Sequence, residues 1–261
     1  MASSGDTLLQ DKVCIVTGAA SGIGATIADL FVQQGARVHI FDINGSLSES
    51  TASEINLKFS PDPSSHRCFA HEIDVTDAER LSTSVHAVLT LEGRIDVLIN
   101  NVAIYPRVMF EDMSEQQWDH IMDTNLTSVF RLCKLVVPTM RKQSFGKIVN
   151  ISSVVIFTGH SGGWCHYIAS KAGIVGFSRS LAKEVGSQNI YVNVVTPGAV
   201  DTPVEHTRSD PVILAKLLEN QTLKKRVLPI DVAQTCLFLA SSMSDGITGQ
   251  IINVDGGLYF H

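Results

Sequence analysis

Short apolar runs recur along the chain, and each predicts a buried strand. They cover residues 12–17, 36–41, 67–73, 95–99, 147–151, 191–195 and 250–254. Most of the runs are nearly continuous in apolar residues, with little alternation of polar and apolar positions. That pattern is typical of parallel strands buried on both faces of a sheet. The runs therefore predict a seven-stranded sheet.

Helical patterns lie between these runs. The spacing of Ile27, Leu30 and Phe31 predicts a helix after the first strand, and Ser114-Glu115-Gln116-Gln117 is a capping-box start for a long helix that contains Asn125. Further helices are expected over residues 47–59, from about residue 76, and over residues 231–240. Alternation of strands and helices predicts a doubly wound, mostly parallel α/β domain with helices on both faces, formed by residues 1–261 as one unit.

Two polar stretches interrupt the pattern. Residues 60–65 are rich in Pro, Ser and Asp and predict a surface loop within the domain. Residues 204–227 show no clear periodicity, and a mobile lid over the substrate, from about residue 200 to residue 227, is the role we expect for this region.

Composition narrows the function classes. With 261 residues, 28.3 kDa and 44% hydrophobic residues, the chain can bury a large core in one domain. No apolar run reaches membrane-spanning length and residues 1–10 lack a secretory pattern, so we expect no membrane partner and a cytoplasmic location. The net charge of -6 disfavours a nucleic-acid partner. The five cysteines are scattered without a Cys-x-x-Cys pair, so we expect buried thiols and no metal site.

The first strand runs into a glycine loop. Gly18, Gly22 and Gly24 lie between this strand and the following helix. Glycines allow backbone amides to approach a pyrophosphate, and the helix N-terminus adds unpaired N–H groups and a positive dipole. Asp42 ends the second strand 18 residues after Gly24, where a carboxylate can accept hydrogen bonds from the adenosine ribose. The arrangement predicts a dinucleotide site that prefers NAD over NADP.

Tyr167 and Lys171 form a candidate acid/base pair. If this stretch is helical, the two side chains are four positions apart and share one face. A free phenol has a pKa of about 10, and a nearby ammonium group lowers it toward the useful range. A surface pair of the same spacing is the alternative. The serines Ser152 and Ser153, at the carboxyl end of the fifth strand, favour the catalytic interpretation because ligands of open α/β sheets bind there.

These motifs resemble those of the short-chain dehydrogenase/reductase family. The glycine spacing Gly-x-x-x-Gly-x-Gly, the Tyr-x-x-x-Lys pair and the strand ends match in order from about residue 9 to residue 257. The resemblance implies that Ser153 holds the substrate oxygen, Tyr167 moves its proton and Lys171 lowers the pKa of Tyr167, while Asn125 holds a water that links Lys171 to solvent. It also implies a homo-oligomer, either a dimer or a tetramer.

The resemblance also assigns a cofactor site. The residues implied are Gly18, Ser21, Gly22, Ile23, Gly24, Asp42, Asp74, Val75, Asn101, Tyr167, Lys171, Pro197, Gly198, Val200 and Thr202. Asp74 has an alternative role as the cap of the helix that follows it. The family usually shows Asn-Asn-Ala-Gly where this chain has Asn100-Asn101-Val102-Ala103, so the backbone under the nicotinamide ribose is expected to shift.

The expected reaction is hydride transfer between NAD(H) and a small-molecule carbonyl/alcohol pair, with no metal. Side chains expected around the substrate are Ser153, Val155, Trp164, Tyr105 and Val204. This wall is mainly apolar, which favours an uncharged hydrophobic ketone or secondary alcohol, although Arg107 at the rim is able to reach an anionic tail. Two alternatives stay open. One is an NADPH-dependent 3-oxoacyl reductase, against which Asp42 argues, and the other is a regulator that senses NAD without turnover.

Overall fold

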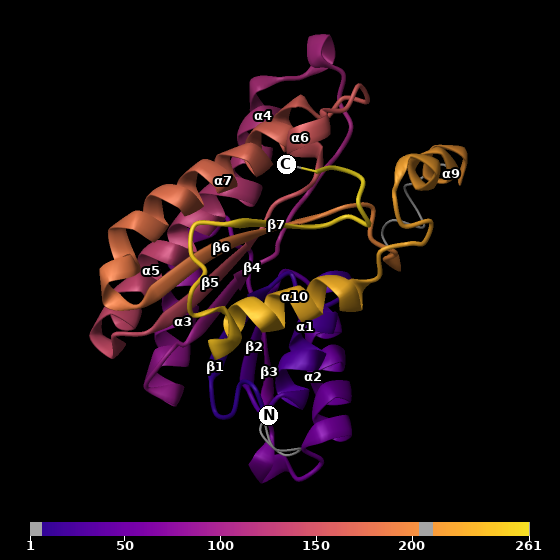
Figure 1. Cartoon of the computed structure of the whole chain (residues 1–261). Coiled ribbons are helices and arrows are strands. Elements are labelled where there is room, and N and C mark those ends of the chain that lie inside the picture. Colours follow the sequence, from indigo (N-terminus) through magenta and orange to yellow (C-terminus); the bar gives the residue numbers. More distant parts are fainter. Residues whose placement is uncertain (1–6, 204–210, 261) are drawn as a thin grey trace.

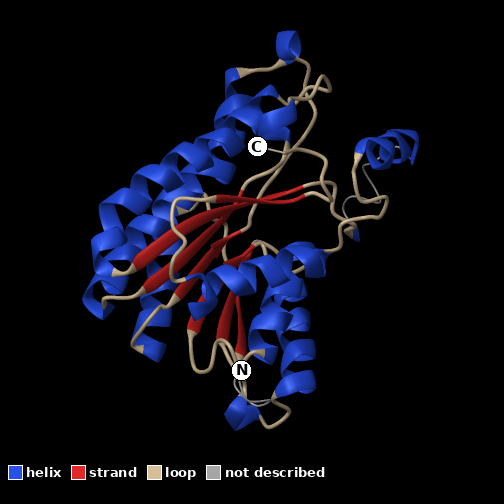
Figure 2. Cartoon of the chain, in the orientation of Figure 1, coloured by secondary structure: helices blue, strands red, loops and turns tan. Residues whose placement is uncertain are grey.

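Seven strands form one sheet in which every neighbouring pair is parallel, with the order β3-β2-β1-β4-β5-β6-β7. The strands are β1 (Val13–Thr17), β2 (Arg37–Asp42), β3 (Cys68–Glu72), β4 (Val97–Asn100), β5 (Gly146–Ile151), β6 (Ile190–Pro197) and β7 (Ile251–Val254). The computed structural model describes residues 7–203 and 211–260. Figure 2 shows the strands in red with helices around them. All seven expected strands are present, and the doubly wound α/β class is confirmed.

Helices cover both faces of this sheet. The helices of the described residues are α1 (Gly22–Gln33), α2 (Gly45–Phe59), α3 (Ala78–Glu92), α4 (Glu115–Met122), α5 (Ser128–Gln143), α6 (Val155–Thr158), α7 (Cys165–Val185), α9 (Pro211–Asn220) and α10 (Pro229–Ala240). In Figure 1, α1, α2 and α10 lie together on one side and α3, α5 and α7 on the other. Two separate apolar cores match this division, one for each face.

Strand β1 shows why the apolar runs are continuous. Cys14 and Val16 belong to the core on the side of α1 and α10, whereas Val13 and Ile15 belong to the core on the side of α3 and α5. Successive side chains of a strand point to opposite faces, and here both faces are covered. Every residue of β1 is therefore buried.

Some element boundaries differ from the sequence expectations. The long helix expected from Ser114 has the predicted capping box with Gln117 but ends at Met122. A π-helical turn (Asp123–Thr127) follows and leads into α5. Helix α2 begins at Gly45, earlier than expected, because Asn44 accepts a hydrogen bond from the Leu47 amide (3.1 Å). The start of α2 is set by a side-chain cap that the apolar pattern does not contain.

The region expected to form a lid contains α9 in its described part, while residues 204–210 lie outside the description. Four of the five cysteines are buried, but Cys165 in the first turn of α7 is exposed, so the expectation of burial was wrong for that thiol. None of the helices described is both long and apolar enough to cross a membrane.

The chain reverses its winding direction at β1, whose neighbours are β2 on one side and β4 on the other. Connections leave the carboxyl ends of these strands toward opposite faces of the sheet, which opens a crevice between them. The glycine loop follows β1 at this position, and the loops after β4, β5 and β6 begin at the same edge of the sheet. This edge is where the predicted site residues are brought together.

Candidate active site

The glycine loop has the backbone shape of a phosphate cradle. Gly18 and Gly22 adopt positive φ angles of 63° and 58°, and the Gly18 amide donates to the Phe41 carbonyl (2.7 Å). A Cβ on Gly24 would collide with the backbone of Gly18 and lie 2.8 Å from the Ala19 Cα. Both positive φ angles and this close approach favour glycine. The loop thus needs all three glycines to bring the start of α1 under a ligand.

Helix α1 begins at this loop with open hydrogen-bond donors. Ser21 occupies the N-cap position but makes no side-chain capping bond, and no acidic residue lies in the first turn of the helix. Ile23 packs its side chain partly against the core. The N-terminal amides and the Ser21 hydroxyl are therefore available to an anionic group, as expected of a pyrophosphate site.

Asp42 lies at the end of β2, next to the glycine loop. Its Oδ2 accepts from the Ala20 amide (3.0 Å) and its Oδ1 from the Asn44 amide (3.0 Å). In the described part of the chain, no lysine or arginine forms an ion pair with this carboxylate. Two backbone amides thus fix this carboxylate beside the glycine loop.

Asp74 forms a turn beyond the end of β3. Its Oδ1 accepts from the amide (2.9 Å) and the hydroxyl (2.7 Å) of Thr76, and these hydrogen bonds lower the pKa of Asp74. Asp77 caps α3 through the Arg80 amide (3.0 Å), so the alternative role of Asp74 as the helix cap was wrong. Val75, between them, is buried.

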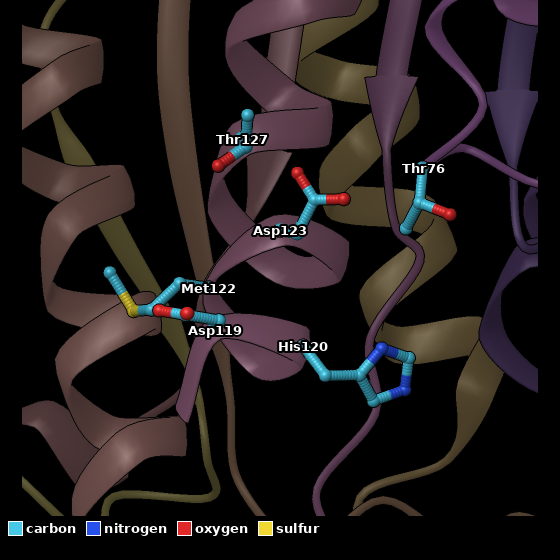
Figure 3. Close-up of a pocket in the computed structure, with 6 residues that line it drawn as sticks. All are labelled: Thr76, Asp119, His120, Met122, Asp123 and Thr127. Carbon is cyan, nitrogen blue, oxygen red and sulfur yellow. The ribbon is translucent and has the colours of Figure 1, made fainter. Parts of the chain in front are cut away.

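A polar hollow of about 490 Å³ borders this turn. It is lined by Thr76, Asp119, His120, Met122, Asp123 and Thr127. In Figure 3, the side chains of His120 and Asp123 extend toward Thr76. The lining contains none of Ser153, Tyr167 and Lys171, so this hollow is not the place where those side chains meet.

Asn101 anchors the loop after β4 to the glycine loop. Its Nδ2 donates to the carbonyls of Thr17 and Gly18 (3.0 Å each), and the amides of Asn101 and Val102 donate to the Thr17 hydroxyl (3.0 and 3.2 Å). The Val102 side chain lies 3.1 Å from where a Cβ of Gly18 would stand. The unusual valine therefore packs on the glycine loop while its amide keeps the loop anchored.

Lys171 is buried beside Tyr167 on α7. Its Nζ lies 6.0 Å from the centre of the Tyr167 ring and donates to the Ile151 carbonyl at the end of β5 (2.7 Å). Only 1% of Lys171 is exposed, and desolvation lowers its pKa to about 7. The surface-pair alternative was therefore wrong, because a buried ammonium group aimed at a strand end is not a solvated helix pair.

The two serines after β5 differ in their environment. Ser152 is buried and its hydroxyl donates to the Lys171 carbonyl (2.8 Å). Ser153 is partly exposed, and among the described residues its hydroxyl oxygen accepts only a long bond, from the Val155 amide (3.4 Å). The Ser152 hydroxyl is used in a hydrogen bond between the sheet and α7, so Ser153 has the hydroxyl that is able to bind a ligand.

Asn125 sits in the π-helical turn and is fully buried. Its side chain pairs with the backbone of Ile104, accepting from the amide and donating to the carbonyl (2.9 Å each), and it also donates to the Ser170 hydroxyl (3.2 Å). Ser170 in turn donates to the Tyr167 carbonyl (2.7 Å). Asn125 thus joins the loop after β4 to helix α7.

Aromatic side chains stand around the Tyr167 ring. The ring centres of Tyr105 and Trp164 lie 5.7 Å and 5.8 Å from that of Tyr167, and Val155 in α6 is partly buried. Phe157 stacks on Tyr259 near the chain end (4.7 Å). The expected pocket residue Val204 lies outside the described residues.

The end of β6 closes the other side of the crevice. The Pro197 carbonyl accepts from the Val154 amide (3.0 Å), and the Gly198 amide donates to the Val254 carbonyl (3.0 Å). Val200 is buried and bridges to Val227. Thr202 faces the glycine loop, since its methyl group lies 3.7 Å from where a Cβ of Gly22 would stand.

Two supporting residues, Thr17 and Ser170, were not identified from the sequence, and for Ser152, which was named with Ser153, the sequence did not indicate a supporting role. Thr17 ties two loops together, Ser170 links Asn125 to α7, and Ser152 holds Lys171. Each is a small hydroxyl residue next to a predicted site residue, but only the three-dimensional contacts separate it from an ordinary surface serine or threonine. Among residues 7–203 and 211–260, no group of three or more His, Cys, Asp or Glu side chains is arranged to hold a metal ion.

Comparison with known proteins gives consistent matches over nearly the whole chain. Residues 18–259 match a family model described as Enoyl-(Acyl carrier protein) reductase. The protein named 3-oxoacyl-(acyl-carrier-protein) reductase FabG of Chlamydia muridarum is 42% identical over 258 residues, covering 97% of this chain and 99% of that protein. The protein of the same name from Thermotoga maritima is 41% identical over 251 residues, covering 96% and 98% respectively.

Proposed function

The chain belongs to the short-chain dehydrogenase/reductase family and is an oxidoreductase; from this premise we propose that it transfers hydride between NAD(H) and a ketone/secondary alcohol pair. The observation that carries the proposal is the buried Lys171 Nζ, held 6.0 Å from the centre of the Tyr167 ring by the Ile151 carbonyl. When bound, the nicotinamide ring supplies the hydride or accepts it.

The proton steps belong to Tyr167. In reduction, the phenol donates its proton to the forming alkoxide while Ser153 donates a hydrogen bond to the same oxygen. The resulting phenolate is stabilised by the Lys171 ammonium group, which also donates a hydrogen bond to the Ile151 carbonyl. Since the pKa of Lys171 is about 7, the fraction of Lys171 that carries a charge falls as the pH rises above neutrality.

Asn125 has a supporting role in this proposal. Its side chain is occupied by Ile104 and Ser170, so it fixes the loop after β4 against α7. The π-helical turn around it leaves backbone carbonyls out of the regular α-helical ladder, which is a common feature of functional sites. A water held at this turn would connect Lys171 to solvent, as the family resemblance implies.

The residues present fit a dinucleotide. The glycine loop and the start of α1 would hold the pyrophosphate, and Asp42 would accept the ribose hydroxyls. Asn101, Pro197, Gly198, Val200 and Thr202 would surround the nicotinamide half. We propose NAD over NADP because Asp42 is negative, is fixed by two amides and has no cationic partner among the described residues.

For the substrate, we place 3-oxoacyl thioesters first. This rests on the names of the two relatives, which match over nearly the whole chain at 42% and 41% identity. Cofactor and substrate are separate questions, so a 3-oxoacyl reductase that uses NADH is compatible with Asp42. A hydrophobic aryl ketone is the second candidate, favoured by the aromatic rings of Tyr105 and Trp164 beside Tyr167.

Two features outside the reaction centre also belong to the proposal. The segment around α9 would act as a lid, since it belongs to the region that comes after the end of β6 in the sequence. A homo-oligomer is supported by the apolar surface between α5 and α7, where Phe130 is 47% exposed and contacts Phe177. Sedimentation analysis measures the oligomeric state, and a monomer at micromolar concentration would contradict the proposed homo-oligomer.

The test is a matrix of substrates and cofactors. An acetoacetyl thioester, an aryl alkyl ketone and a keto acid would each be assayed with NADH and with NADPH, by loss of the reduced-cofactor absorbance. We expect turnover of the thioester or of the aryl ketone, with NADH preferred. Tight NADH binding without turnover of any carbonyl compound would favour the regulator over the enzyme.

A further inference from the structure

Trp164 stands at the centre of a cluster beside Tyr167. Its ring centre lies 5.8 Å from that of Tyr167 and 6.3 Å from that of Tyr105. The His160 ring packs on the indole at 4.3 Å, and the Arg107 guanidinium lies over it at 5.1 Å. The indole is therefore held on several sides next to the proposed acid/base residue.

Backbone contacts fix this cluster in place. The Val108 amide donates to the Gly163 carbonyl (3.0 Å), which joins the loop after β4 to the loop before α7. Gly163 has a φ of 75°, and a Cβ there would lie 2.8 to 2.9 Å from the backbone of Val108. Only glycine fits such an approach. Trp164 follows Gly163 directly, so its position is set by the backbone as well as by ring packing.

The indole N–H of Trp164 is a buried donor without an acceptor among the described residues. A buried unpaired donor is costly, and native proteins keep few of them. Neither of the two polar side chains packed on the indole offers an acceptor to this N–H. Arg107 has only donors, and His160 uses its Nδ1 to accept from the Gly162 amide (2.9 Å), which leaves a donor at Nε2 of the neutral ring.

We infer that this N–H binds a second oxygen of the substrate, so that Trp164 selects ketones with a carbonyl group one methylene away, as in 3-oxo esters and thioesters. The inference rests on the proposed function. The ring centres of Tyr167 and Trp164 lie 5.8 Å apart, so a small ligand held at Tyr167 would also contact the indole, and a 1,3-dicarbonyl compound has a second oxygen for its N–H. A simple ketone leaves the indole N–H unpaired, which lowers its affinity.

Two matched substrates test this selection. Ethyl 3-oxobutanoate and heptan-2-one have chains of equal length, but only the ester has the second carbonyl. In Trp164→Phe, which keeps an aromatic ring and removes the N–H, we expect the ratio of kcat/KM for ester over ketone to fall about five- to tenfold, through KM for the ester. Trp118→Phe is the control, because Trp118 is a partly exposed residue of α4. A ratio unchanged in Trp164→Phe would overturn the inference.

A spectroscopic measurement on the unmodified protein covers the case in which the Phe variant does not fold. The chain has two tryptophans, so its indole N–H spectrum contains two signals, assigned with Trp118→Phe. In complexes with NAD⁺, where no hydride is available, we expect the ester to shift the Trp164 signal downfield and heptan-2-one to leave it nearly in place. Equal shifts would also overturn the inference. If neither substrate is reduced with either cofactor, the proposed function itself fails.

Discussion

Asp42→Ser is the substitution that most sharply tests cofactor choice. It removes a negative charge from the adenosine end of the crevice and keeps a short polar side chain able to accept from the Asn44 or the Ala20 amide. Wild-type protein is expected to prefer NADH, because the 2′-phosphate of NADPH would lie beside the carboxylate. In the serine variant, that preference should weaken or reverse.

The magnitude follows from the two hydrogen bonds that fix Asp42. Two unit charges about 4 Å apart, at an effective dielectric constant of about 20, repel by roughly 4 kcal/mol, which is an upper figure. Rotating the carboxylate away relieves the repulsion but gives up two bonds from backbone amides, at a net cost of about 1.5 to 3 kcal/mol each. The carboxylate will either tolerate the repulsion or give up its hydrogen bonds, whichever costs less free energy. NADPH should therefore be disfavoured by about 2 to 4 kcal/mol, or roughly 30- to 1,000-fold in kcat/KM.

The assay compares kcat/KM for NADH and NADPH with one carbonyl substrate. We expect Asp42→Ser to raise kcat/KM for NADPH about 100-fold and to lower that for NADH about tenfold. Glu72→Gln is a matched control, since Glu72 is an exposed carboxylate that lies opposite Asp42 in the register of β2 and β3. Equal use of both cofactors by the wild type, or an equal change in Glu72→Gln, would refute the reasoning.

Other predictions concern the serines and a buried histidine. Ser153→Ala should lower kcat about 100-fold or more by removing the hydrogen bond to the developing oxyanion, and a larger kcat loss in Ser152→Ala would exchange their assignments. Ser152→Ala should instead lower the free energy of unfolding by about 1 kcal/mol, measured in urea, because its bond to Lys171 is buried. Burial lowers the pKa of His39 to about 4, from about 6.5 in the unfolded chain. The neutral buried histidine therefore contributes its full share to the free energy of unfolding above about pH 6.5. About 3 kcal/mol of that free energy is lost as the pH falls toward 4. In denaturant titrations at several pH values, His39→Gln should flatten this acid-side slope, and an unchanged slope would show that His39 is not its source.

Much of the fold was predictable because the central strands of the sheet are covered on both faces. The residues of β1 alternate between two cores, and such a strand leaves a continuous hydrophobic signal in the sequence. The glycine loop was predictable for a related reason, since positive φ angles at Gly18 and Gly22 restrict the residue type. These features are local, so the sequence displays them directly.

Tertiary contacts determined what the sequence did not display. The π-helical turn at Asn125 interrupts a helix whose apolar pattern continues, and the burial of Lys171 depends on the Ile151 carbonyl from a distant strand. The difference between Ser152 and Ser153 is also tertiary, because one hydroxyl meets the Lys171 carbonyl and its neighbour does not. Adjacent residues of the same type carry no such information in a single sequence.

The central claim is that Tyr167, next to the buried Lys171, carries the proton of a carbonyl reduction. The most direct measurement is steady-state NADH oxidation by wild-type protein and Tyr167→Phe with the best 3-oxo thioester or ketone, alongside NADH affinity measured by fluorescence. The account predicts a loss of at least about 100-fold in kcat with nearly unchanged NADH affinity. A Phe variant that keeps more than about a tenth of wild-type turnover would contradict it.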